Sequence, residues 1–133
     1  KTPLAFIEKR RIMDPDNPEV LTLIGDVKGK DVILIDEEVS TGKTIVNAVD
    51  IAKENGANEI VVVFIHPILA EDAVEKMVKL PVKEFVTTDT IPIPKEKRAK
   101  FGNRLHIISI AGLLGEVIRR ANEGRSVGEM FGE

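Results

Sequence analysis

The residues best suited to chemistry lie close together between positions 36 and 44. Two acids, Asp36 and Glu37, follow an apolar run, and the segment Ser40–Thr44, with sequence STGKT, comes shortly after them. Small hydroxyl residues and a glycine allow a backbone to wrap a phosphate, and Lys43 adds positive charge. Neighbouring carboxylates suit the vicinal hydroxyls of a sugar, directly or through a divalent ion. The two parts together predict a site for a pentose phosphate.

Two other structures fit parts of this segment. Asp36 and Glu37 could form a solvated strand end, with Ser40 or Thr41 serving only as a helix cap. The residues Gly42–Thr44 also match the end of a P-loop, GxxxxGK[ST], but Glu37 stands where the first glycine of that motif belongs. A carboxylate there would oppose the phosphates that the loop must encircle, so we exclude a P-loop NTPase.

The elements around this segment predict an α/β domain. Apolar runs without polar alternation, typical of strands buried on both faces, occur at 32–35, 60–65 and 105–110. Helical patterns separate or follow them, from about 45 to 52, from about 71 to 80, and from about 109 to a point before Gly124. We therefore expect a mostly parallel sheet with helices on either side. The buried face of the last helix is predicted to contain Ile110, Leu113, Leu114, Val117, Ile118 and Ala121.

The remaining segments are expected at the surface. Shorter apolar runs at 4–7 and 20–24 flank the Pro-rich stretch Asp14–Pro18, which we predict to be a mobile hairpin-like loop. The stretch 89–102 is expected to be a surface excursion. Because ligands bind at the ends of strands in open α/β sheets, the acids and the STGKT segment occupy a favoured position.

The composition limits the classes of function. The chain of 133 residues suits one domain, and 19 basic against 22 acidic residues leave a net charge of −3. This balance favours no nucleic-acid partner, and no apolar run reaches the roughly 20 residues of a membrane span. The absence of cysteine and of a signal-peptide pattern suits a cytoplasmic protein. The chain opens without Met on an apparent strand, so we expect a fragment.

Several motifs resemble one family along the whole chain. VILIDEEVSTGKT resembles the motif that binds phosphoribosyl diphosphate (PRPP) in type I phosphoribosyltransferases. The segments LAFIEKRR, IGDVKGKDVILIDE, VTTDTIP and LLGEVIRRANEGRSVGEMF are similar, in order, to ribose-phosphate diphosphokinases. The resemblance implies the type I phosphoribosyltransferase fold, with a mostly parallel sheet flanked by helices and a flag hairpin near the N-terminus. Residues 1–133 would form the C-terminal domain, without the N-terminal half that supplies much of the ATP site.

The resemblance also implies a reaction. The 1-hydroxyl of ribose 5-phosphate would attack the β-phosphorus of ATP in the presence of Mg²⁺, giving PRPP and AMP. Asp36 and Glu37 would bind the ribose hydroxyls, while Lys9 and Arg11 would neutralise charge on the transferred diphosphoryl group. The implied ligands of the 5-phosphate are Ser40, Thr41, Gly42, Lys43 and Thr44.

Some positions differ from the family pattern. Glu37 replaces a second aspartate, Glu38 an apolar residue and Ser40 an aspartate. In the terminal SVS motif, which the family links to allosteric phosphate or ADP, Ser126 matches but Gly128 replaces the second serine.

The resemblance further implies that the full-length protein forms a homo-oligomer of dimers arranged in hexamers. Two other functions remain open, namely a phosphoribosyltransferase that consumes PRPP and a non-catalytic subunit associated with the synthase. His66, at a strand end, is expected to be structural.

Overall fold

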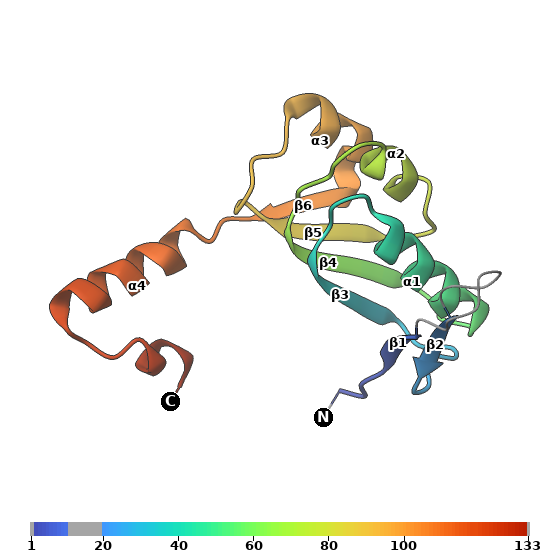
Figure 1. The fold of residues 1–133 in the computed structure, drawn as a ribbon, viewed down its shortest axis with the longest axis horizontal. Helices are drawn as coiled ribbons and strands as arrows, with labels where there is room; N and C mark the ends of the chain where they lie inside the picture. Colours follow the sequence, from blue (N-terminus) through green and yellow to red (C-terminus); the bar gives the residue numbers. More distant parts are fainter. Residues whose placement is uncertain (1, 11–19, 133) are drawn as a thin grey trace.

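The computed structural model describes residues 2–10 and 20–132 (Figure 1). Near the N-terminus, β1 (Phe6–Arg10) pairs antiparallel with β2 (Val20–Ile24). This confirms the hairpin that the resemblance implied. The loop predicted at Asp14–Pro18 lies outside the described residues.

A parallel sheet forms the centre of the molecule, and its strands follow one another in space in the order β3-β4-β5-β6. The fold class is therefore α/β, as predicted. Since all four strands run in the same direction, their carboxyl ends meet at one edge, where Glu38 pairs with His66. The strand bounds are Val32–Glu38 for β3, Ile60–His66 for β4, Glu84–Thr88 for β5 and Leu105–Ile108 for β6.

Three helices cover one face of this sheet: α1 (Lys43–Glu54), α2 (Ala73–Met77) and α3 (Lys95–Phe101). Their apolar residues share one buried cluster with the inward side chains of the strands. Phe85 of β5, for example, meets Phe101 edge to face, with the ring centroids 5.1 Å apart. Burial of this cluster removes a large apolar area from water and supplies the main stabilisation of the fold.

The opposite face of the sheet is exposed along its edge strands. Alternation along β3 turns Ile33 and Ile35 away from α1, and these side chains are 67% and 73% exposed. Ile108 of β6 is 58% exposed. Within the described residues, the prediction of helices on both faces is therefore wrong, because α1, α2 and α3 all pack on the same side.

The last helix, α4 (Ala111–Glu123), stands away from the sheet (Figure 1) and has no buried residue. The prediction that its apolar stripe forms a buried face is wrong for this structure, because Leu113, Leu114 and Ile118 are 45%, 49% and 68% exposed. A hydrogen bond from the Ile110 N–H to Asp89 Oδ1, 2.9 Å long, holds the junction between β6 and α4. No helix in the described ranges has the length and apolar content of a membrane span.

Two further expectations need correction. The second helix was expected from about residue 71 to 80, but α2 is shorter at both ends. Glu71 has a φ of 49°, which lies outside the right-handed helical range, so residue 71 cannot form part of this helix. The expected surface excursion at 89–102 instead buries Ile93, shortly before α3, and Phe101, at the end of α3, against the core.

Candidate functional site

The loop 40–44 encloses a small hollow between β3 and α1. This hollow, of about 240 Å³, is lined by the five predicted phosphate ligands, together with Asp36, Glu38, Val39 and Ile45. The structure thus brings the STGKT segment and one of the two predicted acids to the same place.

Gly42 gives the loop its shape. It has a φ of 75° and directly precedes α1. The chain therefore enters the helix through a left-handed conformation, which glycine adopts without strain. The first helical hydrogen bond runs from the Val46 N–H to the Gly42 carbonyl, at 3.0 Å. Backbone N–H groups earlier in the first turn have no acceptor within the helix. Together with the helix dipole, they make the hollow suitable for an anion.

The acids at the end of β3 do not all reach this hollow. Side chains alternate along a strand, so Asp36 and Glu38 line the hollow, whereas Glu37 lines neither this hollow nor the larger cavity next to it. The Glu37 N–H donates a 2.9 Å hydrogen bond to Asp36 Oδ1, which orients that carboxylate. The joint role of Asp36 and Glu37 stays a prediction. Sequence reasoning missed Glu38 as a residue of the hollow. The signal that could have found it is its position two residues after Asp36, because residues at that spacing lie on the same face of a strand.

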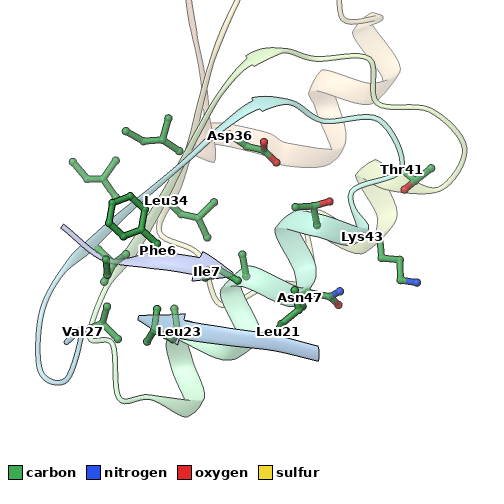
Figure 2. Close-up of a pocket in the computed structure, with 17 residues that line it drawn as sticks. Phe6, Ile7, Leu21, Leu23, Val27, Leu34, Asp36, Thr41, Lys43 and Asn47 are labelled. Carbon is green, nitrogen blue, oxygen red and sulfur yellow. The ribbon is translucent and has the colours of Figure 1, made fainter. Parts of the chain in front are cut away.

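A larger cavity of about 520 Å³ lies between the hairpin, β3 and α1 (Figure 2). Its polar end is formed by Asp36, Thr41, Lys43, Thr44 and Asn47, and apolar side chains from β1, β2 and β3 line much of the remainder. Sequence reasoning missed Asn47, although it follows Lys43 by one helical turn and so lies on the same face of α1. The combined site can hold a polar ligand at the loop next to an apolar space.

The carboxyl ends of β4 and β5 contain a separate polar network. His66 Nδ1 lies 3.0 Å from Thr90 Oγ1, and the hydroxyls of Thr88 and Thr90 both donate to the Ile65 carbonyl, at 2.8 and 3.0 Å. His66 lines neither cavity. Its structural role stays a prediction.

The other predicted site residues lie apart from the loop or outside the described residues. Lys9 pairs with Leu21 in the hairpin, but its side chain is outside the described part of the structure, as is the whole of Arg11. Ser126 is exposed after α4, and its carbonyl accepts a 2.8 Å hydrogen bond from Arg120 Nη1. Among the described residues, no group of three His, Cys, Asp or Glu side chains is arranged to hold a metal.

Comparisons with known proteins agree on one family. The ribose-phosphate pyrophosphokinase of Caldanaerobacter subterraneus subsp. tengcongensis is 42% identical over 129 residues, and that of Oceanobacillus iheyensis is 40% identical over 131 residues. These matches cover 97% and 98% of this chain. The chain spans 40% of the length of each of these relatives.

A solved structure is also similar. The phosphoribosylpyrophosphate synthetase from Mycobacterium smegmatis matches 90% of this chain and 37% of its own, with a TM-score of 0.77 and 35% identity. This likeness confirms the type I phosphoribosyltransferase-like fold. The family model described as the phosphoribosyl synthetase-associated domain matches residues 7–132. Because this match spans nearly the whole chain, the protein belongs to the phosphoribosyl synthetase-associated domain family.

Proposed function

We propose that this chain binds ribose 5-phosphate at the loop 40–44 and contributes that site to a ribose-phosphate diphosphokinase. In the complete enzyme the 1-hydroxyl of the sugar attacks the β-phosphorus of ATP, which gives PRPP and AMP. The observation that carries the proposal is the hollow of about 240 Å³ formed by the STGKT segment at the start of α1. Relatives named ribose-phosphate pyrophosphokinase support the reaction class.

The loop would act by binding and orientation. The backbone N–H groups that begin α1, the hydroxyls of Thr41 and Thr44, and the ammonium of Lys43 all suit the 5-phosphate. Asp36 lines both the hollow and the larger cavity, so it can accept hydrogen bonds from ribose hydroxyls. Fixing both ends of the sugar holds its 1-hydroxyl in one orientation, which lowers the entropy cost of the transfer.

The residues present fit a Mg²⁺ ion that is held mainly by substrate oxygens. Mg²⁺ favours one or two carboxylates together with phosphate and water ligands, and the hollow offers Asp36 and Glu38. These two carboxylates would hold the ion, and the ion would supply charge neutralisation at the phosphates. The magnesium requirement is thus part of the proposal.

Lys9 and Arg11 carry the proposed stabilisation of the transferred group. Phosphoryl-type transfer depends on cationic groups placed where negative charge develops. In the complete enzyme, Lys9→Ala is expected to lower turnover far more than the affinity for ribose 5-phosphate. ATP and the homo-oligomer predicted for the full-length protein belong to the same proposal.

Calorimetry with ribose 5-phosphate tests the proposed site. Thr41→Ala and Lys43→Met are each expected to weaken binding roughly tenfold, as loss of one hydrogen bond to a charged group does. Lys79→Met, at an exposed lysine after α2, is the matched control and should bind like the unaltered chain. Unchanged affinity in both loop variants would show that the phosphate binds elsewhere.

A second candidate is a non-catalytic subunit that associates with the synthase, and the description of the matching family favours it. A product assay on the full-length protein distinguishes the two. Formation of AMP from ribose 5-phosphate and ATP supports the synthase. A protein that assembles with an active relative but produces no AMP alone supports the associated subunit, whereas base-dependent release of diphosphate from PRPP contradicts both.

A further inference from the structure

The loop 40–44 is attached to the segment that joins β4 to α2. The Val39 N–H donates to the His66 carbonyl at 3.0 Å, and the Leu69 N–H donates back to the Val39 carbonyl at 2.8 Å. The Ala70 N–H donates to the Ser40 carbonyl at 2.9 Å. These bonds continue the pairing of β3 with β4 beyond the sheet, so the position of residues 66–70 determines where the loop begins.

This supporting segment holds an unfavourable backbone conformation. Leu69 has a φ of 49° although it carries a side chain, and that side chain is only 1% exposed. A left-handed residue with a Cβ is strained, and strain of this kind persists only where the surroundings enforce it. The conformation of Leu69 therefore requires support from neighbouring groups.

Lys97 supplies such support from α3. Its Nζ donates a 2.6 Å hydrogen bond to the Leu69 carbonyl, and its side chain is half-buried. A hydrogen bond from a charged donor is stronger than one between neutral groups. The start of α2, which follows this segment, also lies close to the loop, because a Cβ placed on Gly42 would be 3.5 Å from Ala73 Cβ.

We propose that Lys97 is a positioning residue for the phosphate site, acting through Leu69 on the backbone of Val39 and Ser40. The inference rests on the proposed binding of ribose 5-phosphate. Lys97 lines neither the hollow nor the larger cavity, so its effect on a bound phosphate is indirect. If the loop is already held in its binding conformation, the free-energy cost of ordering it on ligand binding is smaller.

The binding test compares Lys97→Met with Lys95→Met, a change at an exposed lysine on the same helix. Calorimetry with ribose 5-phosphate should show binding that is weaker by up to roughly tenfold for Lys97→Met, because the ligand must then order the loop itself. Lys95→Met should bind normally, and Lys97→Arg should regain most of the affinity because it restores a charged donor. Should Lys97→Met not fold, Lys97→Gln replaces it with the same expectation.

Hydrogen exchange provides a readout that needs no ligand. In Lys97→Met the amides of Leu69 and Ala70 should exchange faster, while the central amides of β4 keep their protection. Normal binding by Lys97→Met, or exchange that accelerates evenly throughout the chain, overturns the proposal. Failure of the unaltered chain to bind ribose 5-phosphate refutes the proposed function, and the exchange result then decides separately whether Lys97 positions the loop.

Discussion

The region that carries the loop 40–44 and the region around α4 owe their structure to different forces. In the first, α1, α2 and α3 bury one face of the sheet, and Val49, Phe64 and Phe85 are fully buried. In the second, α4 has no buried residue, and Leu114 is 49% exposed. Apolar burial therefore stabilises the first region and does little for the second.

Local contacts stabilise α4 instead. Arg119 pairs with Glu116 at 2.8 Å and with Glu123 at 3.2 Å, and Arg120 pairs with Glu116 and Glu129 at 2.8 and 2.9 Å. Ion pairs at the surface contribute about 0–1 kcal/mol each, and of these side chains only Arg120 is largely covered, at 14% exposure. A helix of 13 residues without tertiary packing is marginal in water. We infer that α4 unfolds locally at a lower free energy than the sheet and its three helices.

The largest contrast is expected for one substitution made on the two faces of the sheet. Ile60→Ala, at a side chain with 0% exposure, should lower the free energy of unfolding by about 2–5 kcal/mol because it leaves a cavity. Ile35→Ala, at a side chain with 73% exposure, should change it by about 0.5 kcal/mol or less. Urea unfolding followed by circular dichroism measures both. Equal losses would mean that the exposed face is covered in solution.

A pair of arginines gives the next largest difference. Arg104 donates to the Val78 and Val82 carbonyls at 2.6 and 3.1 Å, and its guanidinium lies 5.6 Å from the centre of the Phe85 ring. Arg104→Met should destabilise the chain by about 1–3 kcal/mol, because carbonyls lose their donor. Arg119→Met in α4 removes only exposed ion pairs and should leave the main unfolding midpoint unchanged. A shift of that midpoint by Arg119→Met would show that α4 unfolds together with the sheet.

Two left-handed glycines, one in each region, test the same comparison between the sheet and α4, with a smaller expected change in the free energy of unfolding. Gly42 and Gly124 have φ values of 75° and 69°, so alanine at either position costs about 1–2 kcal/mol of local strain. Gly42→Ala should lower the stability of the whole sheet region, because Gly42 directly precedes α1 and α1 packs on the sheet. Gly124→Ala should only shorten α4, which is detected as a loss of helical chemical shifts without a change in the unfolding midpoint. Coinciding effects of the two variants would contradict independent unfolding of α4.

Much of the fold was predictable because the relevant signals are local. Apolar runs located three of the parallel strands, and helical periodicity located α1 and α4. The loop was predictable for the same reason, since the residues of the STGKT segment that line the hollow are continuous in the sequence, although the backbone contacts that support it come from residues 66–70.

What the sequence did not predict depends on contacts between distant segments. Ile33 and Ile35 are as apolar as buried residues, so the pattern could not reveal that α1, α2 and α3 all pack on the other face. The start of α2 was misplaced because Glu71 adopts a left-handed conformation without being glycine. The hydrogen bond from Lys97 to Leu69 joins positions 28 residues apart, and no local pattern indicates it.

The smallest expected effect concerns the response of α4 to acid. Arg119, and secondly Arg120, lower the pKa of Glu116 from its ordinary value of 4.5 to about 2. Because the folded pKa is depressed, the support that Glu116 gives α4 is complete above about pH 4.5 and is lost as the pH falls towards 2. Helical chemical shifts of α4 should decline over that interval, and 1 M salt should weaken the dependence by screening the charges. In Glu116→Gln this decline of the helical chemical shifts should be smaller. The control Glu96→Gln, on α3, should show the same decline as the unaltered chain. An unchanged acid response in Glu116→Gln would mean that contacts other than these ion pairs maintain the helix.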